Sequence, residues 1–335
     1  MGKRQEIQFI NFLQFIGPIL VILGHSLNGI PLEGFWRVFT KKWIYMFHMP
    51  LFFMIAGYLL SYNNWMNEKN YKSFTKKKFY RLIVPYLVWN GVFYVPKYFL
   101  QNYLVDDVQF NIFYLIKIFI TPRQNIWGHT WFLVGIFLVY LFTPIWVKMF
   151  SKITVQKIII YCILGVILYV LPIQTEVLCL SDLHKDILFF WIGCILGQYD
   201  IEKLKKLTKK ILIPNIFLAI VVSLICLNVI TSPRLWFLPC SLILMTLLSI
   251  GLNFDGKLNN MILKYSRHSF GIYIMHWPAM LIIRVIFFQI FKLNTYITIC
   301  LMIIAGIIVP NITISLLNKI KLGKLNKILN YLLGV

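Results

Sequence analysis

Three histidines lie inside long apolar stretches of this 335-residue chain, at positions His25, His48 and His276. Ionisable side chains inside a membrane segment are costly unless they are paired, so each of the three is a candidate functional group. An imidazole ring titrates near neutral pH and can take a proton from a hydroxyl group. The histidines are therefore the first candidates for acid–base chemistry. Each could instead hydrogen-bond a neighbouring helix, a contact worth about 1 kcal/mol.

The first of these histidines belongs to a polar stripe. Asn11, Gln14, Pro18 and His25 follow one another within a single apolar run. At about 100° per residue, a helix places all four within about 60° of one face. At about 1.5 Å of rise per residue, Asn11 and His25 lie about 20 Å apart and cannot touch. The stripe predicts a helix face turned toward protein, with His25 in the outer half of the membrane.

The other two histidines also have polar or helix-bending neighbours. His48 comes shortly before Pro50, which removes a backbone hydrogen bond and bends a helix. We expect His48 at a depth similar to that of His25, where two histidines from adjacent helices could form one site. Tyr273 and His276 share a helix face because they are three residues apart. We expect His276 to lie nearer the cytoplasmic side.

Two cations stand at the entry to another apolar run. Lys78 and Arg81 are three residues apart, where a lysine-rich stretch meets an apolar segment. Such a pair on one helix face could hold the same phosphate group. A charge run at a helix end is usually only a topology signal, but an arginine so close to the apolar run is unusual. The pair is therefore a candidate site for a phosphate-bearing ligand.

The composition requires lipid as the solvent for most of these residues. Hydrophobic residues make up 59% of the chain and charged residues 13%, and the mean hydropathy is +0.76. A water-soluble globule could not cover so much apolar surface. Since a membrane-spanning helix needs roughly 20 apolar residues, we predict an all-α integral membrane protein with about ten transmembrane helices in one bundle, forming a single domain over residues 1–335. The predicted spans are 7–28, 43–62, 80–100, 130–148, 156–172, 184–198, 210–230, 234–252, 270–291 and 295–317.

Two apolar segments need separate interpretation. The first span has no small-residue cleavage site and is too long for a signal sequence, so we expect a membrane anchor. Residues 110–120 are apolar but too few to cross a bilayer, so we expect an interfacial or re-entrant segment.

The charge distribution sets the expected topology. The net charge is +22, and with a cytoplasmic N-terminus 23 of the 33 Lys and Arg residues fall on the inner side. The positive-inside rule then places both termini in the cytoplasm. The lysines are explained by topology and by contact with anionic lipids, so we expect the bilayer and not nucleic acid as the partner.

The six cysteines give no sign of a metal site. They are scattered, mostly within predicted spans, with neither a CxxC pair nor metal-ligand spacing. We therefore expect no bound metal, no disulfide framework and no tightly bound cofactor. The chain also lacks a GxSxG nucleophile motif.

Taken in order, these segments resemble the acyltransferase-3 family of bacterial membrane O-acyltransferases, in particular its fucose 4-O-acetylase-like branch. The resemblance covers almost the whole chain. The matching motifs are the run 20–26 that contains His25, the run 48–53 followed by Ala56-Gly57-Tyr58, the stretch 78–85, Trp131-Phe132-Leu133, and the run 269–276.

The resemblance implies transfer of an acyl group, usually acetyl, from cytoplasmic acyl-CoA to a sugar hydroxyl of a cell-surface glycan. It implies that His25 is the catalytic histidine, and that Lys78 and Arg81 match the family's Arg-x-x-Arg element that contacts CoA. The remaining candidates for supporting or substrate-binding roles are Asn11, Gln14, His48, Trp131, Tyr273 and His276.

This chain departs from the family pattern at three of these positions. The family commonly has Asp in the place of Asn11 and Arg or Lys in the place of Gln14, so an ion pair built there is absent. Lys78 occupies a position where the family has an arginine, and a lysine cannot form two parallel hydrogen bonds to a phosphate group. These changes keep hydrogen-bonding capacity, which favours a divergent enzyme and leaves an inactive paralogue as an alternative.

We therefore expect a multi-pass O-acyltransferase of the bacterial plasma membrane that modifies a capsular or other cell-envelope polysaccharide, or a lipid-linked precursor. His25 would act as a general base, or as a transient acyl-imidazole. A glycan transporter or flippase is the main alternative because it would also have a basic inner face and polar stripes. It would normally carry acidic coupling residues within its spans, and the predicted spans hold a single acidic residue, Asp186. A glycan polymerase would usually have a larger outer loop.

Overall fold

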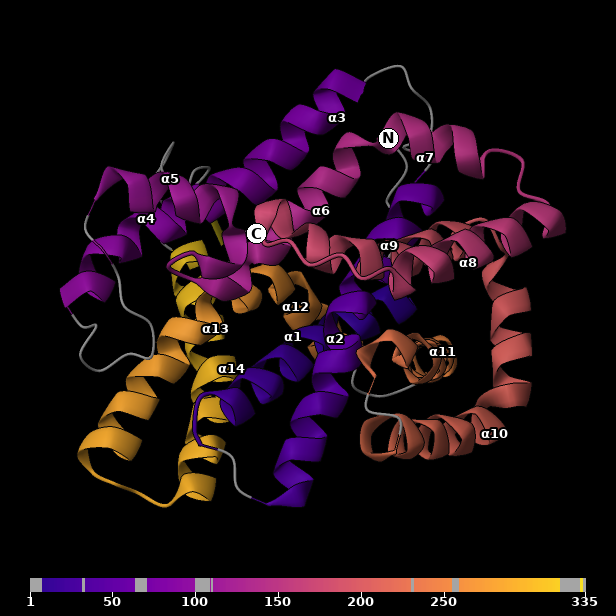
Figure 1. The fold of residues 1–335 in the computed structure, drawn as a ribbon. Helices are drawn as coiled ribbons and strands as arrows, with labels where there is room; N and C mark the ends of the chain where they lie inside the picture. The colour runs from indigo at the N-terminus through magenta and orange to yellow at the C-terminus, as the bar shows by residue number, and fades with distance from the viewer. Residues whose placement is uncertain are drawn as a thin grey trace. The chain divides into compact units, whose positions relative to one another are not determined.

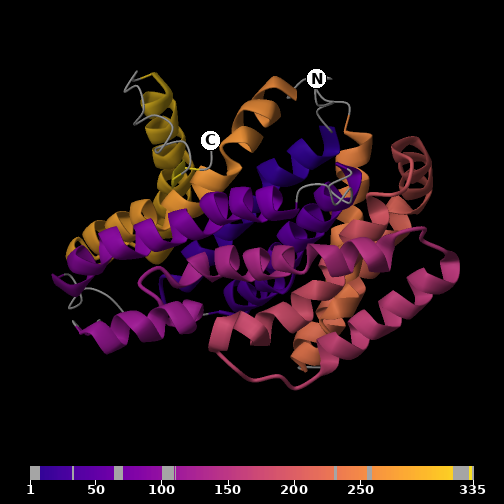
Figure 2. The same ribbon diagram turned by 90° about the horizontal axis from the view of Figure 1, so that it is seen from above.

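The computed structural model describes residues 8–31, 34–63, 71–99, 109, 111–229, 232–254, 259–319 and 332–333, and no strand occurs among them (Figures 1 and 2). The α-helices are α1 (Gln8–Asn28), α2 (Phe35–Tyr62), α3 (Tyr71–Lys78), α4 (Val84–Phe99), α5 (Ile112–Ile120), α6 (Trp131–Leu141), α7 (Thr143–Phe150), α8 (Val155–Val170), α9 (Leu180–Leu196), α10 (Ile201–Asn228), α11 (Phe237–Asn253), α12 (Asn259–Arg267), α13 (Ser269–Ile283) and α14 (Thr295–Lys319). Two π-helices, Phe79–Ile83 and Arg284–Ile290, continue α3 and α13, and 3₁₀ turns occur at Pro122–Gln124, Gly128–Thr130, Val177–Cys179 and Pro233–Leu235.

The helix lengths confirm part of the predicted set of spans. Judged by length and composition, six segments in the described part of the chain could cross a membrane: Gln8–Asn28, Phe35–Tyr62, Ile201–Asn228, Pro233–Asn253, Ser269–Ile290 and Thr295–Leu317. A seventh is possible if Gly128–Leu141 and Thr143–Phe150, which meet at a bend of 58°, form one broken span.

The remaining three predicted spans correspond to shorter helices. The span 80–100 becomes α4 after a π-helical turn, 156–172 becomes α8, and 184–198 becomes α9, with 16, 16 and 17 residues respectively. The apolar stretch 110–120 contains α5, whose nine residues are indeed too few to span. Its interfacial position remains a prediction, as does the topology. The N-terminal cations Lys3 and Arg4, the loop 64–70 and the tail 320–331 lie outside the described residues.

The chain divides into two compact units, although the sequence predicts a single domain. Unit 1 comprises residues 1–55 and 198–322 with residue 335, and unit 2 comprises residues 56–197 and 323–334. The boundary after residue 55 falls within α2, so this helix contributes to both.

In unit 1, two glycines let α1 pack closely against α2. A Cβ atom on Gly17 would lie 2.7 Å from the ring of Phe52, and one on Gly24 would lie 3.1 Å from the ring of Tyr45. The second pair is seven residues further along α1 and seven residues back along α2. The two helices therefore run antiparallel in a fixed register. Small residues at such contacts are typical of helix packing in membranes, where close van der Waals contact drives association.

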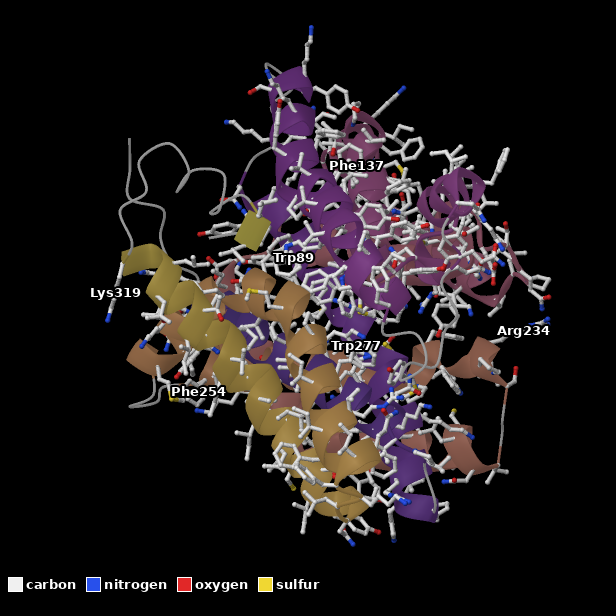
Figure 3. All side chains as sticks on the ribbon, turned by 90° about the vertical axis from the view of Figure 1, so that its left-hand side faces the viewer. Trp89, Phe137, Arg234, Phe254, Trp277 and Lys319 are labelled. Atoms are coloured by element: carbon white, nitrogen blue, oxygen red, sulfur yellow. The ribbon has the colours of Figure 1, made fainter. Side chains whose placement is uncertain are left out.

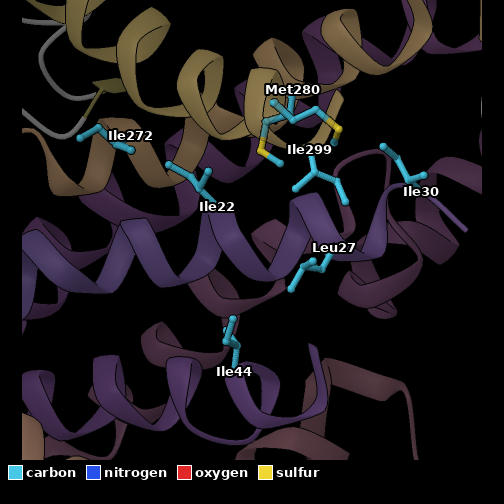
Figure 4. Packing of buried hydrophobic residues seen from close by; sticks show 8 residues of the cluster. Ile22, Leu27, Ile30, Ile44, Ile272, Met280 and Ile299 are labelled. Atoms are coloured by element: carbon cyan, nitrogen blue, oxygen red, sulfur yellow. The ribbon is translucent and has the colours of Figure 1, made fainter. Parts of the chain in front are cut away.

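The core of unit 1 forms where four helices meet. Buried side chains from α1, α2, α13 and α14 converge at Ile22, Ile44, Met280 and Ile299 (Figure 4). The helices α13 and α14 lie side by side in both ribbon views (Figures 1 and 2). A Cβ atom on Gly306 of α14 would approach Ile22 to 3.0 Å, so α14 also packs tightly on α1. This packing holds α1 in place along the stretch that carries His25.

In unit 2, the end of α2 packs against α9 through a glycine contact. A Cβ atom on Gly57 would lie 2.0 Å from the backbone oxygen of Phe190, a distance that no side chain could accept. Gly197 makes a similar contact, with its missing Cβ 2.7 Å from the Tyr58 oxygen. Phe189 and Phe190 are completely buried beneath this contact. The glycine of the Ala56-Gly57-Tyr58 motif is thus required by helix packing.

Candidate functional site

The side chain of His25 contacts a residue of the neighbouring helix. Its ring is partly exposed, and its Nδ1 lies 3.3 Å from the hydroxyl oxygen of Tyr45 on α2. The two rings meet edge to face with their centres 6.0 Å apart. The antiparallel register of α1 and α2 produces this contact, because Gly24 admits the Tyr45 ring beside the next residue of α1. Sequence reasoning missed Tyr45.

The structure brings His25 and His276 together. Their ring centres are 5.3 Å apart, and the ring of Trp277 lies 5.1 Å from that of His25. Figure 3 shows Trp277 on α13. The sequence predicts His276 nearer the cytoplasmic side than His25, whereas the structure places the two rings side by side. Trp277 is a second site residue that sequence reasoning missed, although it follows a candidate histidine directly.

The physical reason is that α12 runs beside the start of α1 before α13 begins. The ring of Phe15 on α1 contacts the ring of Tyr265 on α12, with centres 6.2 Å apart. His25 lies ten residues after Phe15, and His276 lies eleven residues after Tyr265. The two stretches therefore run parallel in near register. Counting His276 from the start of α13 alone underestimates its depth by the length of α12.

His48 and His276 are both buried and both hydrogen-bonded to their own helices. The Nδ1 of His48 lies 2.9 Å from the Ile44 oxygen, and the Nδ1 of His276 lies 2.6 Å from the Tyr273 oxygen. A carbonyl oxygen can only accept, so each Nδ1 carries the proton and a neutral ring presents its lone pair at Nε2. Both histidines thus have a defined tautomer, set by the backbone.

Tyr45 also connects His25 with His48. Its ring lies edge to face with that of His48, with centres 5.0 Å apart. Tyr273 joins the same group, because its ring lies 6.2 Å from that of His276 and 6.2 Å from that of Phe52. Four of the predicted residues, His25, His48, Tyr273 and His276, therefore belong to one cluster in unit 1. We call it the histidine cluster, and it also includes Tyr45 and Trp277.

Asn11 and Gln14 lie further along α1, at the end away from this cluster. Fourteen residues separate Asn11 from His25, about 20 Å along the helix axis. The amide nitrogen of Asn11 is buried and has no hydrogen-bond partner among the described residues. An unsatisfied buried donor costs free energy. Both residues stay candidates for a supporting role, but neither is at the histidine cluster.

The predicted cation pair lies in unit 2. Lys78 ends α3, and its Nζ lies 4.0 Å from the ring centre of Tyr140 and 5.3 Å from that of Phe74. Arg81 is exposed. It lies within the π-helix Phe79–Ile83. A π-helix has a wider turn than an α-helix, so the two cations are not stacked as an α-helical spacing predicts.

Trp131 also lies in unit 2, beneath an ion pair that the sequence did not reveal. The guanidinium of Arg123 lies 4.3 Å from the Trp131 ring centre and donates two hydrogen bonds to Asp182, at 2.6 and 2.5 Å. This bidentate contact ties the loop before α6 to the start of α9. The Cys179 thiol contacts the Trp131 oxygen at 3.9 Å. Burial, followed by the charge of Asp182, raises the pKa of Cys179 to about 12, so this thiol stays protonated and is not a nucleophile.

The described residues contain no group of three or more His, Cys, Asp or Glu side chains that could hold a metal ion. All six cysteines are free thiols. The histidine cluster itself offers imidazole, phenol and indole groups. Such groups can accept and donate protons and can exclude water from a reacting centre.

Two curated proteins match parts of the chain. It is 26% identical over 204 residues to the nodulation protein NolL of Sinorhizobium fredii, a match that covers 59% of this chain and 50% of that protein. It is 36% identical over 90 residues to the nodulation protein NolL of Mesorhizobium japonicum, covering 26% of this chain and 23% of that protein. The matches thus span at most about half the length of these curated relatives. No solved structure matches the chain.

A family model supplies the wider comparison. The model described as an acyltransferase domain (acyltransferase 3) matches residues 7–314, which includes nearly all of the described helices of both units. The match includes every predicted site residue, from Asn11 to His276. It therefore agrees with the resemblance carried by the histidine, lysine–arginine and tryptophan motifs. The chain belongs to the acyltransferase-3 family.

Proposed function

We propose that this protein is an O-acyltransferase that moves an acetyl or other short acyl group from cytoplasmic acyl-CoA to a sugar hydroxyl. The acceptor is a cell-surface or capsular polysaccharide or its lipid-linked precursor, and the protein resides in a bacterial plasma membrane. The observation that carries the proposal is the environment of His25. It is a partly exposed imidazole inside a membrane-spanning helix, held at Nδ1 by the hydroxyl of Tyr45.

His25 acts as the general base in this proposal. Its Nε2 takes the proton of the acceptor hydroxyl while the hydroxyl oxygen attacks the thioester carbonyl carbon. A C–O bond forms and the C–S bond breaks. The CoA sulfur leaves as a thiolate and takes the proton back from His25, which gives free CoA thiol, the sugar ester and neutral histidine. General base catalysis of this kind typically contributes a rate factor of about 10² to 10⁴.

The cations of unit 2 hold the phosphate groups of acyl-CoA. Arg81 is exposed, and Lys78, three residues earlier in the chain, is partly exposed and lies over the Tyr140 ring. A lysine offers a point charge to a phosphate group, whereas an arginine can form two parallel hydrogen bonds. In this proposal Arg81 provides the geometric specificity and Lys78 adds attraction.

The test compares cells that express the wild-type protein, the His25→Ala variant or neither, in a host whose envelope glycan this protein modifies. NMR of the purified glycan measures the content of O-acyl groups, and immunoblotting measures the protein in the same membranes. We expect O-acylation only with the wild-type protein, at equal abundance of the variant. A glycan transporter would change the amount of surface glycan but not its acylation, and an inactive paralogue would change neither. Full acylation with His25→Ala would exclude His25 as the base.

A further inference from the structure

Whether His25 can serve as a base depends on which of its nitrogens carries the proton. A neutral imidazole has one N–H donor and one lone pair. If Nδ1 carries the proton, Nε2 offers a lone pair to the substrate hydroxyl. If Nε2 carries it, that atom can only donate a hydrogen bond. The partner of Nδ1 therefore decides the chemistry of the ring.

For the other two histidines of the cluster, a backbone carbonyl determines which ring nitrogen carries the proton. The oxygens of Ile44 and Tyr273 accept from the Nδ1 atoms of His48 and His276. At His25 the Nδ1 atom contacts a side-chain oxygen from another helix, the hydroxyl of Tyr45 at 3.3 Å. A phenol can accept or donate, so the tautomer of His25 depends on a side chain that can be replaced without changing the backbone.

The packing of α1 and α2 holds the Tyr45 ring in this place. The missing Cβ of Gly24 would lie 3.1 and 3.5 Å from two ring carbons of Tyr45, so the ring lies directly against the α1 backbone. On its other side the ring meets His48 edge to face. The hydroxyl is thus aimed at His25 by contacts that do not involve the oxygen itself. Removing only the oxygen should leave the ring and the helix packing in place.

We propose that Tyr45 is a positioning residue for His25: its hydroxyl oxygen accepts the Nδ1 proton and so presents the Nε2 lone pair to the acceptor hydroxyl. This inference rests on the proposed function, since the position of the lone pair affects catalysis only if His25 is the base. When His25 takes up the substrate proton, the same hydrogen bond becomes charge-assisted and therefore stronger. Tyr45 itself keeps its proton throughout and forms no bond to the substrate.

The first arm of the test reads the tautomer without using activity. The full-length protein, labelled with ¹⁵N at histidine, is placed in lipid nanodiscs, and the His25 signals are assigned by their loss in His25→Ala. We expect nitrogen chemical shifts typical of a ring protonated at Nδ1 in the wild-type protein, and a mixture of tautomers in Tyr45→Phe. A wild-type ring protonated at Nε2, or identical spectra for Tyr45→Phe, would overturn the proposal.

The second arm measures acyl transfer in the same membranes. Removing a hydrogen bond to a charged group costs on the order of 10- to 100-fold in rate. We expect Tyr45→Phe to lower kcat by that factor, with KM for acyl-CoA within about twofold of wild type. The control is Tyr265→Phe, which removes the same atom from another tyrosine ring that packs against α1, and which should keep wild-type kcat. An unchanged kcat for Tyr45→Phe would overturn the proposal.

The two arms separate the failure of this inference from the failure of the proposed function. A wild-type protein that transfers no acyl group would refute the proposed function, while the nitrogen shifts would still decide whether Tyr45 sets the tautomer. An active wild-type protein with an unchanged Tyr45→Phe variant would refute only the role of Tyr45.

Discussion

The two units differ in how they present functional groups. Unit 1 places its histidine cluster on long helices, α1, α2 and α13, each continuous through the residues concerned. Unit 2 places its charged groups where helices are interrupted. Lys78 and Arg81 flank the start of a π-helix, and Arg123 lies in a 3₁₀ turn. The histidine cluster is thus held by regular helices, and these three cations are held by irregular backbone.

Irregular backbone in a membrane protein needs hydrogen-bond partners of its own, because lipid provides none. In unit 2 buried side chains supply them. Asn90 accepts from the backbone nitrogen of Trp127 at 2.9 Å and donates to Thr130 at 3.1 Å. Thr130 in turn donates to the Trp127 oxygen at 2.7 Å. The backbone groups of the turn before α6 therefore have hydrogen-bond partners within the protein. These bonds hold the turn in place, and with it the positions of Trp131 and the neighbouring Arg123.

The largest difference in the rate of acyl transfer is expected between substitution of a histidine in unit 1 and substitution of a histidine in unit 2. We expect His25→Gln in unit 1 to lower acyl transfer by about 10² to 10⁴ in rate. Glutamine can form hydrogen bonds but cannot act as the base. The matched variant is His184→Gln in unit 2, whose parent histidine is also hydrogen-bonded to its own helix, from Nδ1 to the Leu180 oxygen. It should retain wild-type transfer of labelled acetyl groups in membrane preparations. Equal losses in both variants would mean that the histidines act only through packing.

The next effect concerns the helix contact on which unit 2 depends. Gly57→Ala adds a Cβ atom that would lie 2.0 Å from the Phe190 oxygen, so α2 and α9 must move apart. We expect a loss of about 3 kcal/mol or more in stability, seen as a lower unfolding temperature and lower yield in detergent. Gly91→Ala on α4 is the control because no atom lies within 4 Å of its added Cβ. This change should be neutral or stabilise the helix slightly. Similar behaviour of the two variants would contradict the packing described for unit 2.

A charge placed on the polar stripe of α1 tests whether unit 1 is built for neutral groups. We expect Asn11→Asp to cost about 2 kcal/mol in stability, because it places a carboxylate within the candidate membrane span Gln8–Asn28. Adding Gln14→Arg, three residues along the same face, should recover part of the loss. Thermal unfolding of the single and double variants in one detergent measures the coupling. Additive losses would show that the two positions do not interact.

The cation pair of unit 2 should affect donor binding more than turnover. We expect Lys78→Ala and Arg81→Ala each to raise the KM for acyl-CoA roughly tenfold, about 1.4 kcal/mol, with kcat changed less. Lys72→Ala in α3 is the control, since Lys72 is exposed and does not belong to the pair. If abundance falls with activity while KM stays constant, the two cations serve only insertion and topology.

The smallest effect is expected at the ion pair that ties Arg123 to Asp182. The two side chains are 46% and 21% exposed, so solvent screening limits their contribution. We expect Asp182→Asn to lower stability by about 1 kcal/mol and to leave the histidine cluster of unit 1 unchanged. The measurement is the unfolding temperature, together with the histidine nitrogen shifts. A change in those shifts would show that the two units are coupled.

The sequence by itself determined the helical membrane class, because span length and apolar composition are local properties of the chain. The six candidate spans and the family membership follow from it, as does the choice of His25, His48, Tyr273 and His276. Three of the ten predicted spans are helices of only 16 or 17 residues. The predicted span 80–100 is shortened because apolar composition does not show that α4 begins only after a π-helical turn. The bend between α6 and α7 is likewise not visible in hydropathy.

The tertiary structure decided which of the candidate residues meet. His276 reaches the level of His25 only because α12 runs beside α1 first, and no count along a single helix includes that offset. Tyr45 reaches His25 because Gly17 and Gly24 fix an antiparallel register between α1 and α2. Contacts of this kind depend on how two helices pack, and therefore on pairs of residues far apart in the chain. Periodicity places a residue on a face of its own helix, whereas close packing determines which residue of the neighbouring helix it touches.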